Sequence, residues 1–72
     1  MNKYMKCLSD NLQYLMNGMS VSELAKEVHI PQPTLSRYIA CKRQITLENL
    51  VLLADYFNIE IDALIGRKDF YK

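Results

Sequence analysis

Residues 20–42, SVSELAKEVHIPQPTLSRYIACK, constrain the fold more than any other part of the chain. In the first half of this segment, apolar residues recur at the spacing of one helical face. These residues are Val21, Leu24, Ala25 and Val28. Pro31 stops the helix, because it lacks a backbone donor and disfavours the helical conformation at Ile30. The chain is therefore predicted to turn at His29 and Ile30.

The second half of the segment predicts another short helix. It is expected to open at Gln32, because Pro33 has a φ near the helical value and needs no donor in a first turn. Its buried side is formed by Leu35, Tyr38 and Ile39. The polar residues of its first two turns fall outside that side: they are Gln32, Thr34, Ser36 and Arg37. Two short helices at a sharp corner, the second with a polar outward start, have the geometry that reads a DNA groove.

Three further helices are expected around this corner. The first has apolar positions at Met5, Leu8, Leu12, Leu15 and Met19 and ends near residues 17–18, where Gly18 accepts a left-handed exit. The fourth is capped by Thr46 and ends at Asn58. Its inward positions are predicted to be Leu47, Leu50, Val51, Ala54 and Phe57. Residues 61–65 form a short last helix. Tyr14, Tyr38 and Tyr56 are expected to be core or partly buried residues.

In these residues the chain resembles the phage-repressor-like helix-turn-helix family of the Cro and cI type, also called XRE-like. Leu24 and Ala25 are similar to the family's Leu-Ala pair, Ile30 and Leu35 match its apolar positions, and residues 46–66 resemble its last two helices. The resemblance covers nearly the whole chain. It implies an all-α, compact five-helix lambda-repressor-like DNA-binding domain whose helix-turn-helix is formed by helices 2 and 3.

Two departures from the family concern backbone geometry. His29 and Cys41 stand where the family usually has Gly, at the turn and at the end of the second helix of the motif. A left-handed conformation is expected at both, and it is mildly strained for these residues.

Composition agrees with one small domain. The chain has 72 residues, half of them hydrophobic, which suffices for one modest core, so residues 1–72 are expected to form one domain with its core in 4–66 and a short tail, 67–72. No apolar run is long enough to span a bilayer, and no signal peptide is evident, so a cytoplasmic location is expected. Cys7 and Cys41 suggest neither a zinc site nor a disulfide framework. No cofactor, metal or small-molecule substrate is expected, and an enzyme is disfavoured, because His29 and the two thiols form no catalytic constellation.

The charge pattern favours a local contact with DNA. The net charge is only +1, but no Asp or Glu lies between Glu27 and Glu48, whereas Arg37, Lys42 and Arg43 fall inside that interval. A polarised domain can bind a polyanion despite a nearly neutral total.

The residues expected to contact DNA fall into two groups. Gln32, Pro33, Thr34 and Arg37 are predicted to read bases, because Gln can donate to and accept from adenine and Arg can fork onto guanine. The predicted backbone contacts are Ser20, Val21, Ser36, Lys42 and Arg43, with Ser20 at a helix N-terminus that favours phosphate. The alternatives are that these polar side chains are solvated surface groups and that Ser20, with Glu23 three residues later, only caps its helix.

The leading function is a sequence-specific regulator of transcription, most simply a repressor that reads a palindromic operator in double-stranded DNA as a homodimer. The dimer contact is expected at the C-terminal end, at Ile61, Ile65, Phe70 and Tyr71, although Ile61 and Leu64 are also suited to closing the core. The alternative is an antitoxin-like or other protein-interaction module that uses the same apolar surface.

Overall fold

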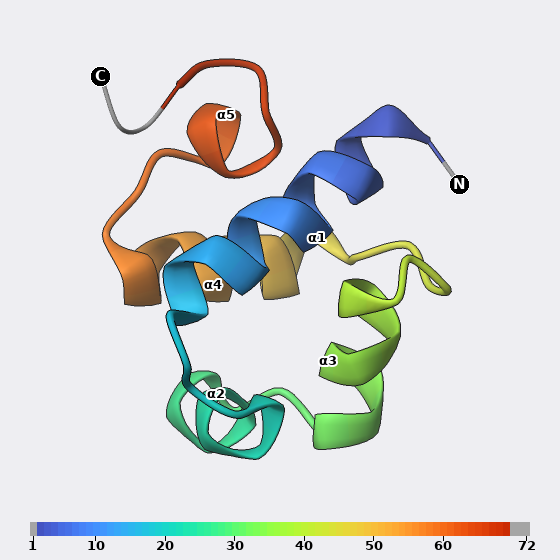
Figure 1. Ribbon diagram of the computed structural model, residues 1–72, viewed down its shortest axis with the longest axis vertical. Coiled ribbons are helices and arrows are strands. Elements are labelled where there is room, and N and C mark those ends of the chain that lie inside the picture. Colours follow the sequence, from blue (N-terminus) through green and yellow to red (C-terminus); the bar gives the residue numbers. More distant parts are fainter. Residues whose placement is uncertain (1, 70–72) are drawn as a thin grey trace.

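The computed structural model describes residues 2–69. This part of the chain consists of helices and the loops that join them, without strands (Figure 1). Five helices follow one another: α1 Lys3–Met16, α2 Val21–Val28, α3 Gln32–Ile39, α4 Leu47–Phe57 and α5 Ile61–Leu64. In Figure 1, α1 crosses the middle of the molecule, α2 and α3 lie below it and α5 lies above it. The predicted all-α, five-helix fold is confirmed. Within residues 2–69, no helix is long and apolar enough to cross a membrane.

Side chains next to the helix starts hold the first turns in place. The Asn2 carboxamide oxygen accepts from the Met5 N–H at 3.0 Å, and Thr46 does the same for Asn49 at 3.2 Å. At α2, the Ser20 hydroxyl accepts from the Glu23 N–H at 3.1 Å, while the Glu23 carboxylate accepts from the Ser20 N–H at 3.2 Å. This reciprocal pair satisfies two backbone donors that the helix leaves open, as the sequence predicted.

A residue with a positive φ lies one or two positions after the last residue of each of the last four helices. In order, these residues are His29, Cys41, Asn58 and Gly66. In each case the next residue donates its N–H to the carbonyl five positions earlier: Ile30 to Ala25, Lys42 to Arg37, Ile59 to Ala54 and Arg67 to Asp62. This is the Schellman ending, which satisfies the last carbonyls of a helix. The left-handed conformation predicted at His29 and Cys41 is confirmed, with φ of 59° and 57°.

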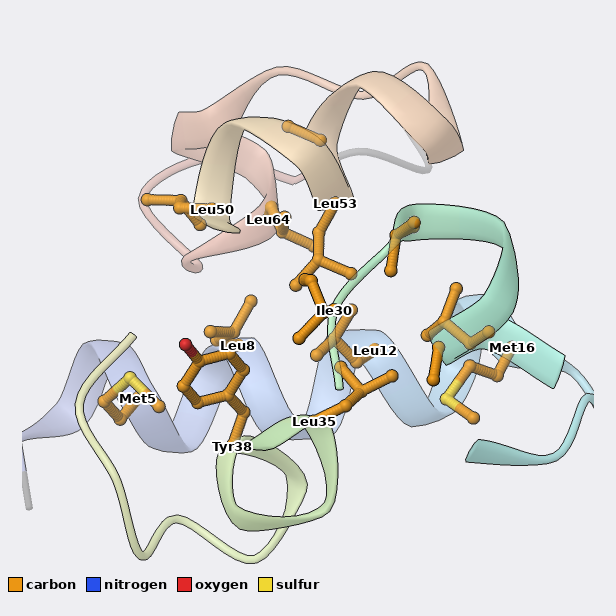
Figure 2. Close-up of a cluster of buried hydrophobic side chains, with 14 residues drawn as sticks. Met5, Leu8, Leu12, Met16, Ile30, Leu35, Tyr38, Leu50, Leu53 and Leu64 are labelled. Carbon is orange, nitrogen blue, oxygen red and sulfur yellow. The ribbon is translucent and has the colours of Figure 1, made fainter. Parts of the chain in front are cut away.

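One cluster of buried apolar side chains joins all five helices (Figure 2). It draws Met5, Leu8, Leu12 and Met16 from α1; Leu24, Ala25 and Val28 from α2; Leu35 and Tyr38 from α3; Leu50, Leu53 and Ala54 from α4; and Leu64 from α5, with Ile30 from the turn. Tyr38 is the largest fully buried side chain of the described residues. Burying this apolar surface is the main favourable term in folding a small domain.

The prediction was wrong about which residues of α4 face inward. Leu47 and Val51 are 74% and 38% exposed, whereas Leu53, which was not predicted, is fully buried. Eight of the eleven residues of α4 are apolar, so several sets of positions satisfy the helical spacing. Tyr14 was also predicted to be core or partly buried and is 66% exposed instead, because it lies outside the buried row of α1.

Candidate nucleic-acid interface

The corner between α2 and α3 is fixed from inside the protein. Ile30 is only 2% exposed and anchors the turn in the core, while His29 adopts the left-handed conformation that reverses the chain. Pro31 precedes α3 with an extended ψ of 138°, and its carbonyl accepts from the Leu35 N–H at 3.0 Å. The two short helices therefore meet at a corner, which is how a helix-turn-helix presents its second helix to a groove.

Helix α3 has a buried side and a polar side. Leu35 and Tyr38 are fully buried, which orients the helix. Of the predicted base-reading residues, Gln32, Pro33 and Arg37 are exposed and Thr34 is half-buried. Ser36, predicted to contact the DNA backbone, is exposed too. The structure thus places these five residues on one short helix, with most of their side chains turned away from the core.

The C-terminal end of α3 is held by α1. The Ser9 hydroxyl donates to the carbonyl of Ile39, the last residue of α3, and the Gln13 amide donates to the Ser9 hydroxyl at 3.2 Å. Ser9 is 3% exposed, and no other polar or charged residue of the described chain is buried. The Cys41 thiol adds a contact to the Met5 carbonyl at 3.7 Å.

Sequence reasoning missed this link between α1 and α3. The available signal was the position of Ser9 itself, a polar residue that stands four places after Met5 in the apolar row of α1. A buried hydroxyl of this kind needs a partner, and a carbonyl at a helix end is one of the few backbone acceptors left open.

The predicted backbone contacts surround α3. Ser20 is exposed at the start of α2, and its hydroxyl, which accepts from Glu23, can still donate to an external acceptor. Val21 is half-buried in the first turn of the same helix. Lys42 and Arg43 are exposed directly after α3, where the Lys42 N–H donates to the Arg37 carbonyl at 2.8 Å.

The positive charges of this region are not neutralised from within residues 2–69. The ion pairs in that range are Lys6–Asp10, Arg67–Asp62 and Lys68–Glu60, and none of them involves Arg37, Lys42 or Arg43. A hydrogen bond with Asp10 raises the pKa of Lys6, and one with Glu60 raises the pKa of Lys68. Arg37, Lys42 and Arg43 therefore have no ion-pair partner within residues 2–69.

Two of the residues predicted to form a dimer contact, Ile61 and Ile65, lie outside the helix-turn-helix corner. Ile61 and Ile65 are half-buried and pack against the core, and Phe70 and Tyr71 lie outside the described residues. Ile65 also lines an open groove of about 300 Å³, together with Tyr4, Leu47 and other residues of α1, α4 and the preceding loop. Sequence reasoning did not identify this groove. It assigned Leu47 to the core and did not single out Tyr4.

A comparison with protein-family models agrees with this geometry. Residues 12–64, which run from the second half of α1 to the end of α5, match a protein-family model described as helix-turn-helix. No curated protein and no solved structure matched in the corresponding comparisons. The family match covers most of the chain and includes both helices of the corner. The chain therefore belongs to the Cro/cI-type, XRE-like helix-turn-helix family of DNA-binding regulators.

Proposed function

We propose that this protein is a cytoplasmic repressor that recognises a palindromic operator in double-stranded DNA as a homodimer. The observation that carries the proposal is the outer side of α3, where Gln32 and Arg37 are exposed beside cations that no described acid neutralises. B-form DNA has a major groove that admits one α-helix, and its base edges present distinct donors and acceptors there. Occupation of the operator would exclude polymerase.

Different residues of α3 contact different parts of the DNA in this proposal. Gln32, in the first turn, donates to and accepts from adenine, and Arg37 forks onto guanine or holds a phosphate. The ring of Pro33 and the methyl group of Thr34 contact a thymine methyl. Ser36 lies on the same helix and contacts the sugar-phosphate backbone.

The flanking elements set the register on the duplex. At the start of α2, Ser20 and the backbone N–H of Val21 bind one phosphate, because the open donors and the helix dipole favour an anion. Lys42 and Arg43 bind the backbone beyond the other end of α3. Such contacts carry affinity and orientation rather than sequence information.

Removal of the Gln32 amide is expected to relax base preference. In a selection from random duplexes, Gln32→Ala should lose discrimination at one position of each half-site, by about 1–3 kcal/mol, which is the usual value of a bidentate base contact. Arg37→Ala should lose it at a neighbouring position, or lose affinity evenly if Arg37 holds a phosphate. Arg67→Ala, an exposed arginine outside α2 and α3, is the matched control and should bind as the wild type. Equal preference in all proteins would contradict the base-reading roles.

Loss of the two cations after α3 is expected to act differently. Lys42→Ala combined with Arg43→Ala should weaken binding to all duplexes alike and reduce the slope of log K against log salt by about two, because two fewer counterions are released. Lys68→Ala combined with Arg67→Ala removes the same charge from the far side and should leave the slope unchanged. If the Lys68 and Arg67 variant lowered the slope and the Lys42 and Arg43 variant did not, the DNA contact would lie away from Lys42 and Arg43.

The groove beside α4 supports a second copy of the chain as its occupant. Leu47 stands at its rim with 74% of its surface exposed, and Tyr4 beside it is 42% exposed. None of the residues that line the groove is charged: they are Asn2, Tyr4, Met5, Leu8, Gln44, Ile45, Leu47, Leu50 and Ile65. A two-fold axis here brings together identical uncharged surfaces, with each Leu47 inserted in the groove of the other copy, which is what an isologous contact requires.

Leu47→Glu is expected to abolish the dimer without unfolding the chain. Two carboxylates would enter an apolar contact, whereas the side chain contributes little to the core because it is largely exposed. Sedimentation should show a monomer at concentrations where the wild type is a dimer, with unchanged helical circular dichroism. Tyr14→Glu, at an exposed position elsewhere on α1, should leave the dimer intact. A dimer that survives Leu47→Glu would move the contact to another surface, such as the C-terminal tail.

A further inference from the structure

Helix α4 has apolar side chains that the rest of the described chain leaves exposed. Its inner side is buried through Leu50, Leu53 and Ala54. On the outer side, Leu52 is 41% exposed and Val51 and Tyr56 are each 38% exposed. An apolar stripe on a helix is normally covered by another element. The outer side is therefore a candidate contact surface, distinct from the groove at the N-terminal end of α4.

The outer side of α4 carries an apolar row next to an acidic row. Leu52 and Tyr56, four residues apart, lie one above the other. Glu48 and Asp55, two turns apart, form the neighbouring row. The Tyr56 ring meets the Phe57 ring edge-on, with centroids 5.0 Å apart, so the apolar row is supported by a residue that packs against the core. We call these four residues, Glu48, Leu52, Asp55 and Tyr56, the outer α4 face.

The acidic row has no ion-pair partner in the part of the chain that the structure describes. Within residues 2–69, neither the Glu48 nor the Asp55 carboxylate forms an ion pair. Asp55 also lines a hollow of about 410 Å³ at the C-terminal end of α4, together with Glu60, whose carboxylate is already bound by Lys68. No basic residue occupies the last turn of this helix, so α4 itself supplies no cation at its C-terminal end. Glu48 and Asp55 therefore favour a cation from another molecule.

We propose that the outer α4 face docks a partner protein through an amphipathic helix with a basic edge. Its apolar side chains cover Leu52 and Tyr56, and its Lys or Arg side chains lie along Glu48 and Asp55, one of them in the hollow at Asp55. A second copy of this chain is a poorer occupant, because a two-fold contact would set the same acids against each other. The uncharged groove around Leu47 has no such obstacle. The regulator thus has one surface for its own copy and another for a basic partner.

A pair of synthetic helical peptides tests this proposal. Both carry Leu at helical spacing on one side; the first has Lys along the edge of the apolar stripe, and the second has Glu at the same positions. Each is titrated into the isotopically labelled full chain while backbone amide resonances are followed. The Lys peptide should shift the amides of residues 48–56, and the Glu peptide should shift none of them. Equal binding of both peptides, no binding of either, or shifts confined to α3 or to the groove would overturn the proposal.

Single variants test the contributions of the apolar row and of the acidic row to peptide binding separately. Leu52→Asn should weaken the binding of the Lys peptide by about tenfold, since it removes one of the two side chains of the apolar row. Asp55→Asn should weaken it by about two- to fivefold, as expected for an exposed charge pair. Glu27→Gln, an isosteric change at an exposed acid of α2, is the control and should have no effect. Sedimentation of Leu52→Asn should match the wild type; a lower state of assembly would instead assign this face to self-association.

Discussion

Tyr38→Ala is expected to lower the free energy of unfolding by about 3–5 kcal/mol, because it empties the largest fully buried site of the described chain. The total stability of a domain of this size is about 4–11 kcal/mol, so the variant should lose a large part of it. Figure 2 shows Tyr38 reaching from α3 into the cluster that holds Met5 and Leu8 of α1. Thermal unfolding followed by circular dichroism should show a midpoint lower by more than about 15 °C.

Tyr38→Phe is the matched control, because it keeps the ring and removes only the hydroxyl. That oxygen accepts a hydrogen bond from the Asn49 amide at 2.8 Å, which links α3 to the start of α4. Its loss should cost about 1 kcal/mol. If both variants unfold at nearly the same temperature, the ring does not carry the packing of α3 on α1. Where Tyr38→Phe remains folded, its choice of operator should be unchanged, since the side chain lies on the inner side of α3.

Gly66→Ala is expected to cost about 2–4 kcal/mol of stability. Gly66 has a φ of +84°, and a Cβ there would lie 2.7 Å from both the Cβ and the Sγ of Cys7. The Cys7 Cβ is fixed by α1, so the chain after α5 has to move away from α1. The Asn11 amide, which donates to the Ala63 and Leu64 carbonyls at 3.2 and 2.9 Å, resists that movement. The unfavourable φ and the overpacking each contribute.

Gly18→Ala separates those two contributions. Gly18 has a similar φ of +90°, but nothing lies within 4 Å of a Cβ built there. It should therefore show the conformational cost alone, about 1 kcal/mol. Chemical denaturation of both variants gives the comparison. Equal losses would mean that the contact with Cys7 relaxes without cost and that α5 is not held closely against α1.

Local signals along the chain were sufficient to predict most of the fold. Ser20 with Glu23, Pro31, Pro33, Thr46 and Asn58 each act on the nearest turn of backbone, and the helices begin or end where these residues predict. The corner followed for the same reason, since a proline and a left-handed residue fix it within a few positions. The polar side of α3 was predictable too, because a helix with Leu35 and Tyr38 inside has to show Gln32 and Arg37 outside.

The orientation of α4 could not be predicted in this way. Its apolar residues satisfy more than one inward set, and the chosen set was rotated toward Leu47 and Val51. The choice depends on where α2 and α5, which both pack on α4, leave room for side chains. The same rotation turned two supposed core residues into exposed ones, and it leaves Leu47 at the groove.

The sequence by itself thus determined the helices, their caps and the helix-turn-helix, because those depend on bonds and dihedral angles within a few residues. Only the tertiary structure decided which contacts hold α3 and α5 to α1: the hydroxyl of Ser9 on the carbonyl of Ile39, and the Cβ-free approach of Gly66 to Cys7. Residues in these pairs are separated by 30 and 59 positions (39 − 9 and 66 − 7). Such contacts form only once the helices have packed, and periodicity along one chain can indicate that Ser9 is buried but does not name its partner.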